Sequence, residues 1–206
     1  MIELYTGTPG SGKSLHAAAD IKYWVENKRE PVICNFNINN SLLRQKGRGQ
    51  IITIKNSDIK DKPEIFKDIS DIYKKKLGIN YIKEDTILII LDESQLLYNS
   101  RSWNDKSRSK WISFFSQHRK LGFKIIMIAQ YAEMIDKQIR ALVEFEYSHR
   151  KVKNISKSAA MLNIVSGGGL HVAVKYYAPF SEKVDQKFFK GNRILYSLYD
   201  SYTLFE

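Results

Sequence analysis

Residues 7–14 form the most specific chemical pattern in this sequence, because they fit the phosphate-binding motif G-x-x-x-x-G-K-S/T completely. Small residues let backbone N–H groups wrap the β- and γ-phosphates of a nucleotide, and a helix that begins at Lys13 points its positive end toward them. Lys13 adds a charge on the phosphates, and Ser14 supplies a hydroxyl ligand for Mg²⁺. We therefore predict ATP and Mg²⁺ as cofactors. The residues predicted to contact the nucleotide are Gly7, Thr8, Pro9, Gly10, Ser11, Gly12, Lys13 and Ser14.

Three polar residues follow apolar runs that are typical of buried strands. Asp92 and Glu93 come directly after Ile87–Leu91, and Gln130 follows Ile125–Ala129. Parallel strands end at the sheet edge where α/β folds bind ligands. Asp92 is therefore expected to hold the hydrated Mg²⁺, Glu93 to act as the catalytic base for water, and Gln130 to bridge the γ-phosphate and that water. The alternatives are that Asp92 and Glu93 only cap the next turn, and that Gln130 is a structural hydrogen-bond partner.

Arginines are the next candidates, because ring-forming ATPases commonly complete the site with an arginine from a neighbouring subunit. Arg140 is the first choice, since it closes a helix-like segment just before a strand. Arg119, in the run Gln117-His118-Arg119-Lys120, is the second. Either could instead be a solvated surface charge.

Basic residues are concentrated in the second half of the chain. The net charge is +11, of which residues 1–100 contribute +2 (15 basic, 13 acidic) and residues 101–206 contribute +9 (18 basic, 9 acidic). This asymmetry favours an anionic partner, either nucleic acid or an acidic membrane face, although a lysine-rich composition alone is the alternative. The predicted polar loop 99–109 contains Trp103 among basic residues, which suits single-stranded DNA, or else a solvated loop anchored by the tryptophan. The four histidines show no metal-ligand spacing, so we predict no zinc site.

These candidate residues need a fold that brings several strand ends together. Strand-like runs alternate with helix-like patterns along the first 150 residues, which predicts an α/β P-loop NTPase fold with a mainly parallel central sheet flanked by helices. Glu93 and Gln130 together favour the type with a catalytic glutamate and an additional strand between the phosphate-loop strand and the Asp-Glu strand. The predicted strands are Ile2–Thr6, Pro31–Phe36, Gln50–Ile54, Thr86–Leu91, Ile125–Ala129 and Leu142–His149; the predicted helices are 14–27, 61–78, 111–121 and 133–140.

The pattern weakens after residue 150, and the domain prediction follows from this change. Residues 1–150 are predicted to form the ATPase core, with an insertion at about 41–85. Residues 151–206 are predicted to form a β-rich extension packed on the core, with a short helix at Ser156–Ile164 and β-rich pieces at Leu170–Tyr177 and Arg193–Leu204.

Bulk properties set the expected location. No apolar stretch approaches the roughly 18 to 20 residues that cross a bilayer, and the N-terminus lacks the pattern of a secretory signal. The single cysteine, Cys34, excludes an internal disulfide framework. We expect a cytoplasmic protein, or one that is peripheral at the inner face of the cell membrane.

Several segments of this sequence resemble the zonular occludens toxin (Zot) family. They are Ile2–Thr6 leading into GTPGSGKS, Asn35, LDESQ at 91–95, HRKLGFKIIMIAQ at 118–130 and Ile139–Val143, with looser similarity at 175–177 and 198–199. The family consists of P-loop ATPases of filamentous phages, similar in kind to the FtsK and HerA DNA pumps. The resemblance implies phage assembly by export of single-stranded DNA across the host envelope. It also implies envelope assembly proteins as partners and a homo-oligomeric ring, a hexamer by analogy.

Other functions stay open at this point. The same motifs suit a double-stranded DNA packaging or translocation ATPase. A small-molecule phosphotransferase has a similar length and phosphate loop, but its arginine-rich lid is not visible in the sequence. A membrane-associated scaffold that uses nucleotide only as a switch is a third possibility. Asp92, Glu93 and Gln130 favour water as the phosphoryl acceptor.

Overall fold

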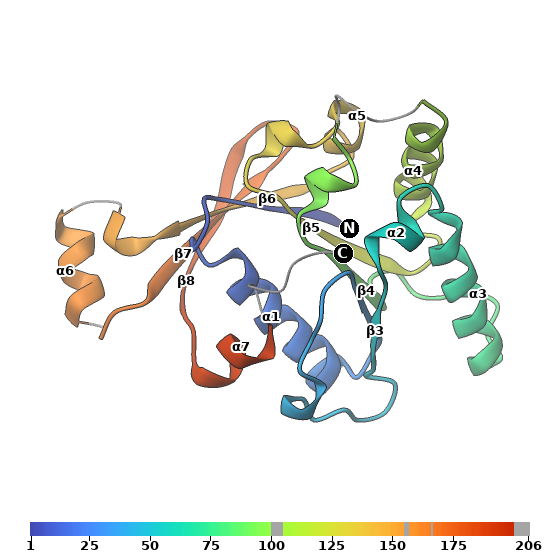
Figure 1. Cartoon of the computed structure of the whole chain (residues 1–206), viewed down its shortest axis with the longest axis horizontal. Coiled ribbons are helices and arrows are strands. Elements are labelled where there is room, and N and C mark those ends of the chain that lie inside the picture. Colours follow the sequence, from blue (N-terminus) through green and yellow to red (C-terminus); the bar gives the residue numbers. More distant parts are fainter. Residues whose placement is uncertain (100–104, 155–156, 166, 200–206) are drawn as a thin grey trace.

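The protein is an α/β structure built on one eight-stranded sheet (Figure 1), as described by a computed structural model for residues 1–99, 105–154, 157–165 and 167–199. The sheet order is β3-β2-β4-β5-β1-β6-β7-β8. Strands β1 to β6 are parallel to one another, β7 is antiparallel to β6, and β8 is antiparallel to β7. The strands are β1 (Ile2–Thr6), β2 (Val32–Cys34), β3 (Ile51–Thr53), β4 (Ile87–Leu91), β5 (Phe123–Ile128), β6 (Phe145–Lys151), β7 (Leu170–Tyr177) and β8 (Glu182–Lys190).

The position of β5 confirms the predicted sheet type. β5 lies between β1, which leads into the phosphate loop, and β4, which leads into Asp92 and Glu93. Ile125 of β5 is in register with both Ile2 of β1 and Ile89 of β4. The carboxyl ends of these three strands therefore meet at one edge of the sheet.

Helices cover both faces of the parallel strands. Alternate residues of β4 face opposite sides, so Ile89 packs with α3 and α4, whereas Ile90 packs with α1. Burial on both faces explains why β4 is apolar throughout. The helices are α1 (Lys13–Tyr23), α2 (Asn56–Ile59), α3 (Glu64–Leu77), α4 (Asp105–Gln117), α5 (Lys137–Arg140), α6 (Lys157–Val165) and α7 (Arg193–Leu198).

Several local predictions are confirmed. α1 begins directly after Gly12 and continues into a π-helical turn at Trp24–Lys28. α3 stops at Gly78, whose left-handed backbone (φ 64°) ends the helix. Within the predicted insertion, β3 pairs with β2 and Phe66 of α3 is fully buried, so this segment is part of the sheet and its helical layer.

Two predictions in the second half need correction, and one strand was missed. Ser107 belongs to α4 and not to a loop, because its hydroxyl and the Trp111 indole both donate to the Lys60 carbonyl. The start of the segment predicted as β-rich, Arg193–Leu198, is helix α7, with the Asn192 side chain accepting from the Leu195 N–H at 2.9 Å. β8 was not predicted, and eight of its nine residues are exposed.

Because β7 pairs with β6, the sheet runs continuously past residue 150, and the two-part division remains a prediction.

Candidate nucleotide site

The phosphate loop adopts a backbone that only small residues allow. Gly7, Gly10 and Gly12 all have positive φ angles, of 142°, 72° and 103°. A side-chain carbon at Gly7 would lie 2.5 Å from the His149 carbonyl oxygen, so this position has no room for one. The loop is also tied to β5, because the Gly7 N–H donates to the Gln130 carbonyl at 3.1 Å.

Lys13 begins α1 and faces back into the loop. Its Nζ donates to the carbonyl oxygens of Gly7, at 2.6 Å, and Thr8, at 3.3 Å. Burial lowers the pKa of Lys13, while the nearby carboxylates of Asp92 and Glu93 raise it. The ammonium is therefore held at the loop, where phosphate oxygens would replace carbonyl oxygens as its acceptors.

Asp92 is fixed by a reciprocal pair of hydrogen bonds with Asn35, at the end of β2. The Asp92 N–H donates to Asn35 Oδ1 at 2.7 Å, and Asn35 Nδ2 donates to the Asp92 carbonyl at 2.9 Å. The carboxylate Oδ1 accepts from the Glu93 N–H at 2.7 Å. Asp92 is only 5% exposed, and burial raises the pKa of its carboxyl group, while hydrogen bonds from Tyr199 and the Glu93 N–H lower it. Asp92 is thus rigid, and it needs donors or a cation around its carboxylate.

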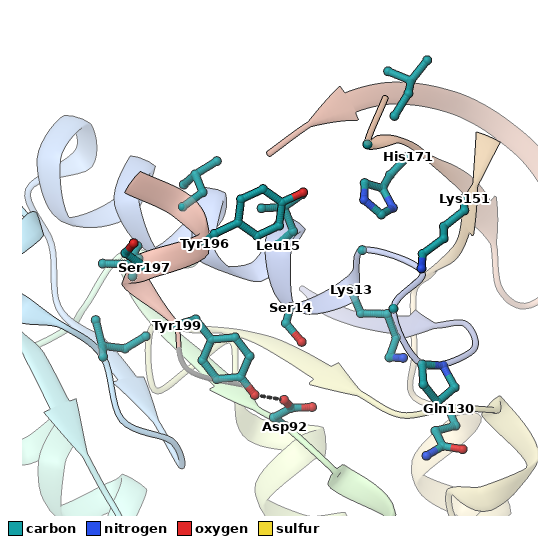
Figure 2. A pocket seen from close by; sticks show the side chains of 18 of the residues that line it. Lys13, Ser14, Leu15, Asp92, Gln130, Lys151, His171, Tyr196, Ser197 and Tyr199 are labelled. Carbon is teal, nitrogen blue, oxygen red and sulfur yellow. Dashed lines mark hydrogen bonds between the residues drawn. The ribbon is translucent and has the colours of Figure 1, made fainter. Parts of the chain in front are cut away.

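Glu93 and Gln130 line the same pocket as the phosphate loop. Glu93 has a left-handed backbone (φ 47°), and its carboxylate accepts from the Gln95 side-chain amide. Gln130 follows β5, and Figure 2 shows its side chain at the loop side of the pocket. The pocket therefore contains most of the predicted residues from the ends of β1, β4 and β5, whereas Gly7, Thr8 and Ser11 do not line it.

The pocket has a volume of about 1330 Å³, large enough for a nucleotide. Sequence reasoning missed several of its lining side chains, which come from β6, β7 and the region of α7 (Figure 2): Lys151, His171, Tyr196 and Tyr199. A side-chain carbon at Gly10 would lie 3.0 Å from Lys151 Nζ, so this ammonium sits against the phosphate loop. Among the described residues, no ion pair joins Lys151 to a carboxylate.

His171 holds the phosphate loop from the β7 side. Its Nδ1 lies 2.8 Å from the Ser11 carbonyl oxygen, which fits a neutral ring that donates from Nδ1. Burial lowers the pKa of His171, so a neutral ring is favoured. His171 lies in the predicted β-rich piece Leu170–Tyr177, whereas Lys151 lies beyond the predicted strand Leu142–His149, and no pattern in the sequence indicated its place in the pocket.

The two candidate arginines lie outside this pocket. Arg119 precedes β5 and Arg140 precedes β6, so each comes before a strand whose opposite end points to the site. Arg119 pairs with Glu144 at 2.9 Å. Neither lines the pocket within one chain, and a role in a neighbouring subunit's site remains a prediction.

The predicted DNA-binding loop is only partly described. Trp103 lies outside the described residues. Arg108 pairs with the buried carboxylate of Asp136 at 2.8 Å, and Lys110 pairs with Glu64 at 3.0 Å. Arg108 therefore has a structural partner that the sequence did not indicate.

The donor groups fit Mg²⁺ and a nucleotide. The Ser14 hydroxyl and the Asp92 carboxylate are hard oxygen ligands of the kind that Mg²⁺ prefers, and they meet beside the helix N-terminus. The buried Ser11 hydroxyl has no hydrogen-bond partner among the described residues. This arrangement of donors, with Lys13 at its centre, suits a chain of phosphates.

Comparison with known proteins agrees with this geometry. The family description "Zonular occludens toxin (Zot)" matches residues 1–203. This chain belongs to the Zot family. It is 33% identical over 214 residues to the Gene 1 protein of Enterobacteria phage I2-2, covering 99% of this chain and 57% of that protein. The Gene 1 protein of Enterobacteria phage M13 is 32% identical over 207 residues, covering 95% of this chain and 58% of that protein.

Solved structures of similar fold include another Zot-family member. The N-terminal domain of zonular occludens toxin from Neisseria meningitidis has a TM-score of 0.54 and 18% identity, covering 97% of this chain and 98% of that one. The genome packaging NTPase B204 from Sulfolobus turreted icosahedral virus 2, in complex with ATP-gammaS, has a TM-score of 0.54 and 15% identity, covering 93% and 97%. These likenesses establish the P-loop NTPase fold. The chain spans less than three-fifths of the length of the phage relatives. Within its described part, no helix has the length and apolar character needed to cross a bilayer.

Proposed function

We propose that this Zot-family chain is an ATP-hydrolysing motor that acts in filamentous phage assembly and exports single-stranded DNA across the host envelope. The observation that carries the proposal is the convergence of Lys13, Asp92, Glu93 and Gln130 on one pocket at the ends of three adjacent strands. Relatives named as phage gene 1 proteins, and a similar fold in a genome packaging NTPase, support the biological setting.

The residues of the pocket would divide the chemistry among them. Lys13 and the loop N–H groups bind the phosphates, and Ser14 and Asp92 would hold Mg²⁺. That cation would supply charge neutralisation at the phosphate oxygens. Glu93 accepts a proton from the attacking water, and Gln130 orients that water. Lys151 adds a second ammonium on the other side of the loop.

DNA binding and ring formation are part of the same proposal. The +9 charge of residues 101–206 supports a polyanionic partner. A ring would supply the arginine that the pocket lacks among its own lining residues, with Arg140 first and Arg119 second.

Rates of ATP hydrolysis test the proposal when measured without DNA, with single-stranded DNA and with double-stranded DNA. We expect Mg²⁺-dependent hydrolysis that single-stranded DNA stimulates most. Stronger stimulation by duplex DNA would favour a double-stranded DNA translocase. Lys13→Ala is the control and should weaken nucleotide binding at least ~10-fold, about 1.4 kcal/mol. Absence of hydrolysis by the wild-type chain under all three conditions would contradict a motor.

Mixing of variants tests the shared arginine. Arg140→Ala subunits retain their own phosphate loop, and Lys13→Ala subunits retain Arg140. Recovery of hydrolysis in the mixture supports an active site shared between subunits. Activity that falls in proportion to the mutant fraction at every ratio would remove Arg140 from this role, and Arg119→Ala is then tested in the same way.

A further inference from the structure

The Tyr199 hydroxyl lies at Asp92, one of the two predicted Mg²⁺ ligands. It donates a hydrogen bond to Asp92 Oδ2, drawn as the dashed line in Figure 2. The other carboxylate oxygen, Oδ1, already accepts from the Glu93 N–H at 2.7 Å. Ser14, the second predicted ligand, lines the same pocket. Both carboxylate oxygens of Asp92 therefore accept from donors of the protein itself.

The backbone around Tyr199 is attached to the core beside this site. Tyr199 forms an isolated antiparallel bridge with Ile38, and the Asn39 N–H donates to the Leu198 carbonyl at 3.0 Å. The Tyr199 ring packs edge-on against Phe36 with 4.4 Å between ring centroids. Tyr199 itself is only 8% exposed. The hydroxyl is thus held at Asp92 by a defined segment and not by a mobile surface side chain.

The chemistry of the carboxylate explains why such a donor is needed. A buried carboxylate is costly unless a hydrogen-bond donor or a cation compensates it. Tyr199 supplies a neutral donor at Oδ2, where Mg²⁺ or one of its water ligands would also bind. The hydroxyl and a hydrated cation would therefore draw on the same carboxylate oxygen of Asp92.

We infer that Tyr199 is a gate of the metal site: its hydroxyl must leave Asp92 when Mg²⁺ and nucleotide bind, which loosens residues 192–199 from the core. This inference deepens the proposed function and rests on it, since it takes Asp92 and Ser14 as the Mg²⁺ ligands. Its consequence is reciprocal, because a partner that pulls this segment away would favour Mg²⁺ binding.

Removal of one hydroxyl group tests the gate. Tyr199→Phe keeps the ring against Phe36 and removes only the competing donor. Loss of a hydrogen bond to a charged group corresponds to about a 10-fold change in an equilibrium constant. We expect about 10-fold tighter binding of Mn²⁺, followed by its electron paramagnetic resonance signal. A similar gain is expected for the fluorescent analogue mant-AMP-PNP with Mg²⁺, but not in EDTA.

Tyr73→Phe is the matched control, because the Tyr73 hydroxyl also donates to a carboxylate, Glu30 Oε2 at 2.5 Å, away from the pocket. It should leave both affinities unchanged. Equal or weaker binding of Mn²⁺ by Tyr199→Phe, with thermal unfolding showing an intact fold, would overturn the inference. If neither wild type nor variant binds mant-AMP-PNP, the proposed function fails, and the Mn²⁺ comparison still decides the gate.

Hydrogen–deuterium exchange of the wild-type chain provides a second test without any substitution. Mg²⁺ with AMP-PNP should raise the exchange rates of amides in residues 192–199 several-fold over AMP-PNP in EDTA. Unchanged or slower exchange in this segment would show that Tyr199 stays in place and supports Asp92, which contradicts the gate.

Discussion

β4 and β8 belong to the same sheet, but they are opposite in their environment. Every residue of β4 is buried, and the strand is apolar from Ile87 to Leu91. Eight of the nine residues of β8 are exposed, and five of the nine are charged. In the parallel region, packing fixes the strands and chemistry is confined to their ends. In β8, Phe189 packs against His16, His149 and His171, and packing places little constraint on the exposed side chains.

The largest expected effect is on catalysis at the end of β4. Glu93→Gln preserves the shape of the side chain but removes its ability to accept a proton. Turnover should therefore fall ~10²- to 10⁴-fold while nucleotide affinity stays within about 3-fold. Glu182→Gln, at the start of β8, is the matched control and should leave turnover unchanged. Normal turnover in Glu93→Gln would show that the catalytic base lies elsewhere. The end of β4 would then be no more important for catalysis than β8.

Stability should show the same contrast through two phenylalanines. Phe115 of α4 is fully buried among Trp111, Phe114 and Tyr98, whereas Phe188 of β8 is 50% exposed. Phe115→Ala should lower the free energy of unfolding by ~3–5 kcal/mol because it leaves a cavity. Phe188→Ala should change it by less than ~1 kcal/mol. Urea denaturation measures both free energies of unfolding. Equal losses in the two variants would show that β8 is packed as firmly as the core of the sheet.

The boundary between the two regions should make stability depend on pH. His16 of α1 and His149 of β6 share a contact of 2.9 Å between Nδ1 and Nε2, and both rings touch Phe189 of β8. His149 Nδ1 lies 2.9 Å from the Tyr147 carbonyl, which fits a neutral ring that donates there and accepts from His16. Burial lowers the pKa of each histidine to about 3, with smaller effects from Lys187 and Lys124 at His16 and from His16 at His149.

The sign of this dependence follows from proton binding. Between the lowered pKa of the folded chain and the ordinary value near 6.5, the unfolded chain binds more protons. The contribution of the two histidines to the free energy of unfolding should therefore be fully present above about pH 6.5. It should fall as the pH decreases, by up to about 1.4 kcal/mol per pH unit for each histidine. Urea denaturation at pH 7.5, 6 and 5 measures it. His16→Phe should give a shallower dependence, and an identical slope would exclude His16 as a cause.

The smallest expected effect concerns Lys151, where the parallel region meets the hairpin. Its ammonium faces the phosphate loop, so Lys151→Ala should weaken Mg²⁺-dependent binding of mant-AMP-PNP by roughly 3- to 10-fold. The exposed Lys183 of β8 provides the control, and Lys183→Ala should bind normally. Equal affinities in the two variants would show that Lys151 only lines the pocket.

Sequence reasoning succeeded where local pattern decides structure. The phosphate loop could be located because its glycines are required by the backbone. β4 and the Ile125–Ile128 part of β5 could be located because strands buried on both faces have runs of apolar residues. Asp92, Glu93 and Gln130 could then be placed in the pocket from strand ends alone. Their catalytic and metal-binding roles are still predictions.

The features that the sequence did not predict depend on distant contacts or lack a periodic pattern. β8 has no buried face and therefore no alternation to detect. The contact of Tyr199 with Asp92 joins residues 107 positions apart in the chain, and Lys151 enters the pocket only because β6 lies beside β1. Arg108 is one of the basic residues of the loop 99–109, which was predicted to bind DNA from its composition. Its pairing with Asp136 could not be predicted, because it depends on the packing of α4 near α5.

The exposed strand β8 has a consequence for how copies of this chain behave in concentrated solution. It is the last strand of the sheet among the described residues, so its outer edge could pair with the same edge of another copy. The net charge of +11 opposes this, because edge-to-edge pairing would bring two positively charged copies together. The protection is electrostatic and weakens as the Debye length shrinks from about 10 Å at 0.1 M salt to about 3 Å at 1 M. Colloidal stability should therefore be greatest at low ionic strength, the condition that also favours attraction to a polyanion.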